Sequence, residues 1–331
     1  MKHSCREILD DWEASGAEKA SQEEVSAMLR LSPDDPQYFR LLCLSHRRSR
    51  AVFGNRGYIF AQIGINAEPC SGQCAFCSMA ASHFAVDGRF RKDASLLCRE
   101  AEELARQGID DLFLMTTADF PQELFLTLAA AVRRRLPAAV RLVANIGDLN
   151  DDMARRLRAT GCTGAYHIRR LREGIDTALS PAAREATLAA LRAAGLRIYY
   201  CIEPIGPEHS PDELAREILF ARELHPEAMA VMRRVPVPGT PKADSGCITA
   251  LELVKIAAIA NLVTAPSRCM NVHEPMQAAL LAGVNQFYAE SGANPRDTAE
   301  RTELGRGLTP AALRAILREG DWQTGTEQGT A

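Results

Sequence analysis

Short apolar runs and longer amphipathic stretches alternate along the central part of the chain. The runs, of which the last two are weaker, are residues 58–65, 112–115, 141–145, 165–168, 196–201, 228–232, 269–272 and 285–288. Each has the length of a buried strand, whereas the stretches between them, such as residues 95–107 and 181–194, repeat with helical periodicity. The pattern therefore predicts eight consecutive strand–helix units.

Eight such units are typical of a (β/α)8 barrel of the TIM type, although periodicity alone leaves a doubly wound open sheet as an alternative. Residues 1–54 are polar and amphipathic and predict an N-terminal helical extension, in which Ser21 and Glu24 form a capping-box pattern. The barrel is expected over residues 55–298. Residues 299–331 are expected to hold a short helix over 310–318 and a tail that is disordered from Thr324 onward.

Composition describes an ordinary globular chain. It has 331 residues, of which 47% are hydrophobic and 24% charged, and a formal net charge of −3. This balance gives no electrostatic footprint for nucleic acid. No apolar run approaches the ~18 residues of a membrane span, and the N-terminus lacks the apolar core of a signal peptide. The ten cysteines are therefore expected to stay reduced in the cytoplasm.

Three of these cysteines, Cys70, Cys74 and Cys77, lie in one short segment with the spacing C-x3-C-x2-C. A structural zinc site needs four ligands, usually as two Cys-x-x-Cys pairs, and the next cysteine, Cys98, falls in a predicted helix. Three thiolates suit a [4Fe–4S] cluster that leaves one iron open. S-adenosylmethionine can chelate such an iron through its amino and carboxylate groups. Zinc and unligated thiols remain the alternatives.

The cysteine segment resembles the radical S-adenosylmethionine signature, including an aromatic residue, Phe76, just before the last cysteine. Residues 184–195, 238–241 and 282–285, with Asn294 and Pro295, are similar to the biotin synthase-like branch, which includes hydrogenase maturase and methylornithine synthase relatives. The resemblance implies that Arg184 holds the carboxylate of S-adenosylmethionine. It also implies that cluster electrons break the sulfonium C–S bond and release a 5′-deoxyadenosyl radical.

The chain departs from biotin synthase in one respect. Biotin synthase carries further cysteines on inner strand positions, which bind a second, sulfur-donating cluster. Here only Cys201 comes near such a position, and it is offset by two residues. Arg268 does occupy the place where that branch has a cluster-binding arginine. Biotin synthesis is therefore not expected, while sulfur insertion of the biotin or lipoyl synthase type stays open as an alternative.

Candidate binding residues follow the predicted strands, because working side chains of barrels lie at the carboxyl ends of strands. Thr116 and Asn145 end the second and third strands, where they could bind the cofactor or act as a helix cap and a turn former. After the fourth strand, His167 and Arg169 share one face by alternation. If that face is the lumen, they could bind a carboxylate or phosphate. Otherwise they belong to an external cluster of ion pairs.

Candidate catalytic residues come from the fifth and seventh strands. Tyr199 and Cys201 share a face, and either could donate a hydrogen atom to a carbon radical. A buried cysteine is, however, usually inert. His273 and Glu274 end the seventh strand and could contact substrate or exchange a proton. A purely structural histidine is the competing interpretation.

The sequence thus predicts a cytoplasmic radical S-adenosylmethionine enzyme that abstracts hydrogen from a small, anionic substrate enclosed in the barrel. Carbon-skeleton rearrangement, metallocofactor maturation and sulfur insertion are the outcomes within this class. The expected electron donor is a flavodoxin or ferredoxin, and no nucleic acid or membrane partner is expected. A non-catalytic iron–sulfur or zinc carrier, or a barrel that has lost catalysis, is the alternative of another class.

Overall fold

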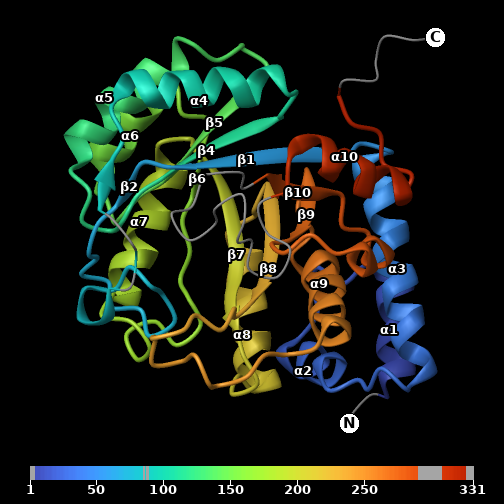
Figure 1. The fold of residues 1–331 in the computed structure, drawn as a ribbon. Helices are drawn as coiled ribbons and strands as arrows, with labels where there is room; N and C mark the ends of the chain where they lie inside the picture. Colours follow the sequence, from blue (N-terminus) through green and yellow to red (C-terminus); the bar gives the residue numbers. More distant parts are fainter. Residues whose placement is uncertain (1–3, 85, 87–88, 290–307, 326–331) are drawn as a thin grey trace, which may run out of the picture.

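Eight parallel strands close into a barrel in the computed structural model, which describes residues 4–84, 86, 89–289 and 308–325 (Figure 1). In chain order they are β1 (Tyr58–Gly64), β4 (Asp111–Met115), β5 (Arg141–Asn145), β6 (Gly164–Tyr166), β7 (Arg197–Ile205), β8 (Ala228–Arg233), β9 (Cys269–Val272) and β10 (Gln286–Ala289). Their order around the barrel follows the chain, and β10 pairs with β1. The predicted TIM-type barrel is confirmed, and the open sheet is excluded.

A helix follows each strand and packs on the outside of the barrel. The helices that come after β1 to β10 are α4 (Ala94–Arg106), α5 (Gln122–Arg133), α6 (Asp151–Ala159), α7 (Pro181–Ala193), α8 (Pro211–Glu223), α9 (Ala250–Thr264), the 3-10 helix η2 (Gln277–Ala282) and α10 (Pro310–Glu319). Capping residues in the sequence mark where most of these helices begin. At α8, for example, Ser210 and Glu213 form a capping box and Pro211 takes the first helical position.

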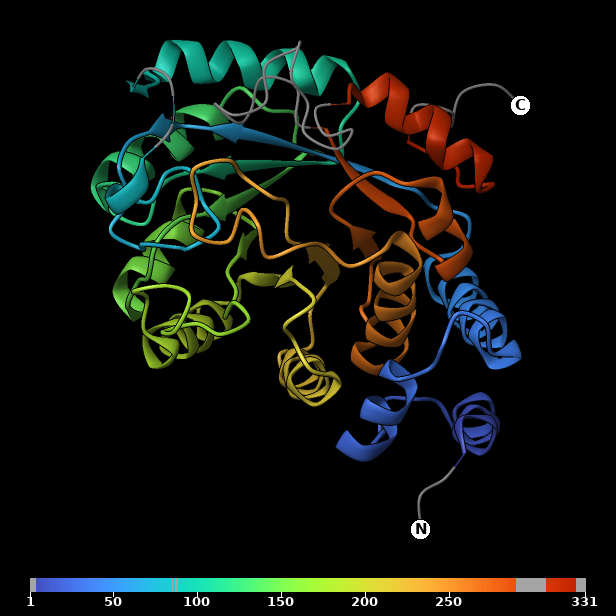
Figure 2. The same ribbon diagram turned by 60° about the horizontal axis from the view of Figure 1, so that its bottom comes forward.

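Three N-terminal helices, α1 (Cys5–Ser15), α2 (Gln22–Leu29) and α3 (Pro36–Phe53), lie on one side of the barrel outside α8 and α9 (Figure 2). Their position explains why α9 is buried over nearly its whole length, since a helix that is apolar all round needs cover on every face. Asn261 of α9 donates hydrogen bonds to the hydroxyl groups of Ser45 and Ser49 on α3, each at 2.9 Å. Ser21 and Glu24 form the expected capping box at the start of α2.

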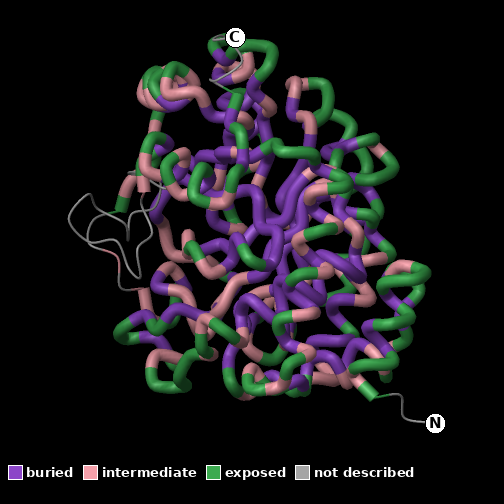
Figure 3. Tube along the Cα trace, turned by 90° about the vertical axis from the view of Figure 1, so that its right-hand side faces the viewer, coloured by how far each residue is buried: buried purple, intermediate pink, exposed green. Residues whose placement is uncertain are grey.

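Aromatic side chains fill the interior of the barrel. Phe60, Phe113, Tyr199 and Tyr288 pack edge-to-face or tilted, with ring centroids 5.1 to 5.9 Å apart. These side chains are at most 3% exposed, and the buried core follows the strands through the centre of the molecule (Figure 3). The four rings form an aromatic layer in the barrel interior, and Phe113 also lines a cavity at the carboxyl ends of the strands.

Several smaller features complete the fold. The short strands β2 (Asn66–Ala67) and β3 (Phe90–Arg91) pair antiparallel beside the barrel, and the 3-10 helix η1 (Ala81–His83) lies between them in the chain. Thr324 is 4% exposed, so the described part of the expected tail begins as packed structure, while residues 326–331 lie outside the described residues. Within the described ranges, no helix has the length and apolar character that crossing a membrane requires.

Candidate radical S-adenosylmethionine site

The three cysteines lie on a loop that leaves β2 and is closed at its base by backbone pairing. Cys70 donates its N–H to Met79 at 2.8 Å and accepts from the N–H of Ala81 at 3.0 Å. This closure bends the segment between them into a compact turn. As a result Cys70, Cys74 and Cys77 all line one small cavity of about 120 Å³, which we call the cysteine cavity.

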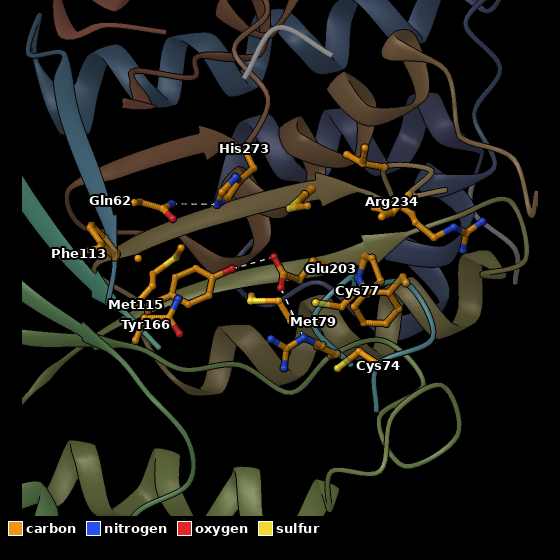
Figure 4. Close-up of a pocket in the computed structure, with 18 of the residues that line it drawn as sticks. Gln62, Cys74, Cys77, Met79, Phe113, Met115, Tyr166, Glu203, Arg234 and His273 are labelled. Carbon is orange, nitrogen blue, oxygen red and sulfur yellow. Dashed lines mark hydrogen bonds and ion pairs between the residues drawn. The ribbon is translucent and has the colours of Figure 1, made fainter. Parts of the chain in front are cut away.

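A second cavity of about 220 Å³, which we call the barrel cavity, opens from the first into the carboxyl end of the barrel. The two share seven lining residues: Cys74, Cys77, Met79, Thr116, Asn145, Tyr166 and Arg170. Figure 4 shows the barrel cavity with the two cysteines at one side and Gln62 and Phe113 at the other. The arrangement forms a two-part chamber with its sulfur ligands at the junction.

A polar cluster forms the wall of the cysteine cavity opposite the loop. Arg184, from the start of α7, lies with Nη1 3.2 Å from Oδ1 of Asp148 and 3.4 Å from Nε2 of His167. Burial lowers the pKa of His167, although Asp148 opposes that effect. Burial also acts to raise the pKa of Asp148, but the His167 contact and the Arg184 charge outweigh it, so that this pKa is lowered. The cluster presents a guanidinium held beside a charged carboxylate.

Several polar atoms of this wall have unused hydrogen-bonding capacity. Within the described residues, Oγ1 of Thr116 and Nε of Arg184 are buried and make no hydrogen bond. Because buried polar groups are normally paired, such atoms point to a missing polar partner. Arg184 pairs with Asp148 through Nη1, and its Nε lies 3.9 Å from Oε2 of Glu173. Three thiols on one loop beside an unpaired hydroxyl and this partly engaged guanidinium fit a [4Fe–4S] cluster together with an amino-acid-bearing cofactor. Thr116, Asn145, His167 and Arg184 line the same cavity as the cysteines, and their predicted role in cofactor binding stays a prediction.

The barrel cavity combines apolar walls with a few polar groups. Gln62 and His273 face each other, with Nε2 to Nε2 at 3.4 Å, and the His273 ring stacks on Tyr288 at 4.7 Å between centroids (Figure 4). Met115 and Met232 line the walls between these polar groups. Phe76 of the cysteine loop also lines this cavity. His273 therefore lines the barrel cavity, and its catalytic role stays a prediction.

Glu203, Tyr166 and Arg170 form the charged group at the junction of the cavities. The Tyr166 hydroxyl donates to Oε2 of Glu203 at 2.8 Å, and Nε of Arg170 lies 3.7 Å from Oε1 of the same carboxylate (Figure 4). Burial raises the pKa of Cys74 to about 12, and the neighbouring charge of Arg170 opposes that rise. Arg170 therefore lies within electrostatic reach of the loop thiols and of Glu203 at once.

The structure corrects the prediction that Arg169 lies beside His167 in the lumen. Arg169 points away from the lumen and pairs with Glu185 of α7 at 2.6 Å and Glu217 of α8 at 2.8 Å. Strand β6 ends at Tyr166, so the alternation that placed Arg169 beside His167 no longer applies three residues later. Arg170 takes the inward position, which the sequence analysis did not identify. The sequence shows several arginines after this strand. Which of them points inward depends on where the strand ends.

Two of the candidate catalytic residues also lie away from the chamber. Tyr199 faces inward but belongs to the aromatic layer below the cavities, where its hydroxyl donates to Asp111 at 2.6 Å. Glu274 forms a double ion pair with Arg233 and lines neither cavity. The described contacts of both residues are with other side chains of the barrel.

Cys201 occupies an intermediate position. It is fully buried next to Tyr166 and Glu203 and does not line either cavity. Burial raises the pKa of its thiol well above the usual range, so the group stays protonated. Its neighbours Tyr166 and Glu203 both line the barrel cavity.

Arg268 lies at the opposite end of the barrel from the cysteine loop. Its guanidinium makes two hydrogen bonds to the carboxylate of Asp111, at 2.6 and 2.7 Å, and stacks over Tyr58 at 4.3 Å. Asp111 is completely buried. This arginine therefore neutralises a buried carboxylate below the aromatic layer.

Comparison with known proteins finds biotin synthases among the relatives of this chain. No protein-family model matches the chain. Biotin synthase from Desulforudis audaxviator is 28% identical over 278 residues, which cover 80% of each chain. Biotin synthase from Acidothermus cellulolyticus is 26% identical over 322 residues, or 89% of this chain and 93% of its own length.

Two solved structures share the fold at 16% identity. Methylornithine synthase superposes with a TM-score of 0.77 over 96% of this chain and 97% of its own. HydG, a maturase of the [FeFe]-hydrogenase, superposes with a TM-score of 0.80 over 96% of this chain and 75% of its own. The two structures show that the chain shares their fold. Together with the cysteine loop and the chamber beside it, the sequence likeness identifies the chain as a radical S-adenosylmethionine enzyme that is similar to biotin synthases.

Proposed function

We propose that this enzyme abstracts hydrogen from a small, anionic molecule enclosed in the barrel cavity. A single observation carries the proposal. Cys70, Cys74 and Cys77 converge on the wall of a chamber whose second part is lined by Arg170, Glu203, Gln62 and His273. Cofactor and substrate would therefore meet at the junction.

The cysteine cavity would hold the cofactors. Cys70, Cys74 and Cys77 would ligate a [4Fe–4S] cluster, and Arg184 would bind the carboxylate of S-adenosylmethionine through its planar fork of donors. Thr116, Asn145 and His167 would supply further hydrogen bonds at the same wall. When bound together, these groups supply a one-electron reductive cleavage that ends in abstraction of hydrogen from a C–H bond.

The chain's own contribution is binding, orientation and exclusion of water. Met79 and Met115 cover the walls between the polar groups, so that a bound ligand would be enclosed by apolar surface. Enclosure of this kind holds the target C–H near the cofactor and protects a reactive intermediate from side reactions. The aromatic layer below closes the chamber from the other end of the barrel.

An anionic substrate is favoured by the charges at the junction. Arg170 and Arg234 line the barrel cavity with one carboxylate, Glu203. Arg234 is already engaged by Glu208 and by the carbonyls of Ser245 and Gly246. Arg170 lies beyond hydrogen-bonding distance of Glu203, so its guanidinium retains donors for a carboxylate or phosphate.

Rearrangement or cleavage of a carbon skeleton and metallocofactor maturation fit this chamber equally well. Sulfur insertion is the less favoured outcome, because Arg268 is committed to Asp111 and Cys201 lies outside the cavities. We propose a flavodoxin or ferredoxin as the electron donor.

The test is anaerobic reconstitution with iron and sulfide, followed by dithionite and S-adenosylmethionine. Formation of 5′-deoxyadenosine by the wild type, and its loss in Cys74→Ala, would support the enzyme. Cys162→Ala is the matched control, because this buried cysteine lies before β6 at the other end of the barrel. A cluster that forms without any 5′-deoxyadenosine would favour a non-catalytic carrier.

A further inference from the structure

Ala75, in the middle of the cysteine loop, forms a closed ring of contacts with one residue from each of two barrel loops, Asp176 and Lys242. Ala75, between Cys74 and Cys77, donates its N–H to the carbonyl of Asp176 at 2.9 Å and accepts from the N–H of Lys242 at 3.0 Å. The Lys242 ammonium in turn lies 3.2 Å from Oδ2 of Asp176. Asp176 follows β6 and Lys242 follows β8, so the ring ties two barrel loops to each other and to one peptide of the cysteine loop.

The ring is anchored to the barrel through a second set of ion pairs. Nζ of Lys242 also lies 3.2 Å from Oε1 of Glu208, on the loop after β7, and Glu208 pairs with Arg234 at the end of β8. Burial acts to raise the pKa of Glu208, but hydrogen bonds from Arg234 and from its own backbone outweigh it and lower this pKa to about 2. The carboxylate is thus charged at neutral pH, and the ammonium of Lys242 lies between two anions.

Asp176, Glu208 and His209 also have the spacing of a possible cation site. The charge balance argues against a bound ion, because Lys242 and Arg234 already neutralise the two carboxylates. The cation that these acids hold is the lysine ammonium itself.

We propose that Lys242 is a positioning residue that closes this ring and thereby holds Cys74 and Cys77 in the arrangement needed to bind the cluster. The inference rests on the proposed function for the role of the thiols, but the ring itself is a property of the metal-free chain. Lys242 contributes both a backbone donor to Ala75 and the charge that links its loop to Asp176. Val235 and Val237 lie on the same loop as Lys242 and line the barrel cavity. The ring therefore also connects this part of the cavity wall to the cysteine loop.

The first test uses the metal-free chain. Lys242→Met keeps the backbone donor and the length of the side chain but removes the cation that lies between Asp176 and Glu208. Each acid then keeps only an arginine from its own side, Arg172 for Asp176 and Arg234 for Glu208. The rate of carboxamidomethylation of Cys74 by iodoacetamide, followed by mass spectrometry, is expected to rise about tenfold, in line with loss of a charge-assisted contact that restrains local opening. Lys242→Arg should restore the slow rate, and Lys19→Met, an exposed lysine between α1 and α2, should leave it unchanged.

Two other cysteines report on specificity in the same samples. Exposed Cys43 on α3 should react at one rate in every variant, and buried Cys162 should stay protected. Equal Cys74 rates in wild type and Lys242→Met would overturn the proposal. So would a parallel rise at Cys162, because it would mean that the whole barrel had loosened.

The second test uses reconstituted protein and the rate at which a ferrous chelator removes iron. Lys242→Met and Asp176→Asn should each speed the loss of iron, and the double variant should lose it no faster than the single ones, because either change opens the same ring. Strictly additive effects would overturn the ring as a unit. If the wild type takes up no iron, the proposed function fails. The alkylation result still decides whether Lys242 restrains the cysteine loop.

Discussion

Nε of Arg170 lies 3.7 Å from Oε1 of Glu203, too far for a hydrogen bond, at the point where the two cavities join. Glu203 is held in place by Tyr166. The Arg170 guanidinium thus lies beside a fixed carboxylate without a hydrogen bond to it, so its donors remain available to another anion. This relationship separates Arg170 from its neighbour Arg169, whose donors are used by acids of α7 and α8.

Arg170→Met is expected to weaken use of the anionic substrate. A panel of small organic acids can be screened for compounds that stimulate 5′-deoxyadenosine formation by the wild type. For such a compound, half-saturation should rise about 10- to 100-fold in the variant, as for loss of a hydrogen bond to a charged group. Unchanged half-saturation would remove Arg170 from substrate recognition.

Arg169→Met is the matched control and should act on stability instead. It leaves the largely buried Glu217 with only the Tyr200 hydroxyl as a side-chain partner, which is expected to cost about 3 kcal/mol in the free energy of unfolding. Denaturant titration measures that loss. Half-saturation for the stimulating acid should stay at the wild-type value, and a shift as large as that of Arg170→Met would contradict the assignment.

Arg184→Met should weaken binding of S-adenosylmethionine to the reconstituted enzyme by about 10- to 100-fold, because a carboxylate would lose charge-assisted hydrogen bonds. Equilibrium dialysis with labelled cofactor measures the affinity. Arg192→Met on the same helix is the control, since its guanidinium contacts the Glu223 carbonyl at the surface. Equal affinities of the two variants would count against Arg184.

The stability of the metal-free chain should depend on pH through His167. Burial lowers the pKa of this histidine in the folded state, so the unfolded chain binds its proton first as the pH falls below about 6.5. Its contribution therefore decreases on acidification, with a limiting slope of about 1.4 kcal/mol per pH unit until the folded pKa is reached. Denaturation of wild type and His167→Gln between pH 7 and 5 should show a shallower slope in the variant; parallel curves would contradict this.

Arg268→Met should destabilise the barrel without removing iron. The change leaves Asp111 buried with only the Tyr199 hydroxyl as a side-chain partner, at an expected cost of about 3–5 kcal/mol. Iron content per folded chain should equal that of the wild type. Lower iron at unchanged stability would show instead that Arg268 ligates a second cluster.

The barrel could be predicted from the sequence because each strand is a short apolar run followed by a helical stretch with clear start signals. Even the weak runs at β9 and β10 form strands. The two-residue strands β2 and β3 are too short to leave a periodic signal and were not predicted. The extension of three helices was predicted as helical, but its packing on α9 depends on contacts between distant residues such as Ser45 and Asn261.

The sequence could not predict how far along the barrel axis each side chain of the site lies. Alternation predicted that Tyr199 and Cys201 share one face of β7, but it could not predict that Tyr199 lies in the aromatic layer, because the height of a residue in the barrel depends on how the strands are staggered. Arg170 was missed because β6 ends at Tyr166 and the chain then leaves the strand geometry. Asp148 became part of the Arg184 cluster only through the fold.

Iron binding and cleavage of S-adenosylmethionine at the same three thiols test the proposed enzyme most directly. Anaerobic reconstitution should give about four irons per chain, the content of one [4Fe–4S] cluster, and dithionite with S-adenosylmethionine should then release 5′-deoxyadenosine. Cys74→Ala should lose both properties. Wild-type protein that binds zinc, or that binds iron but leaves S-adenosylmethionine intact, would contradict the account.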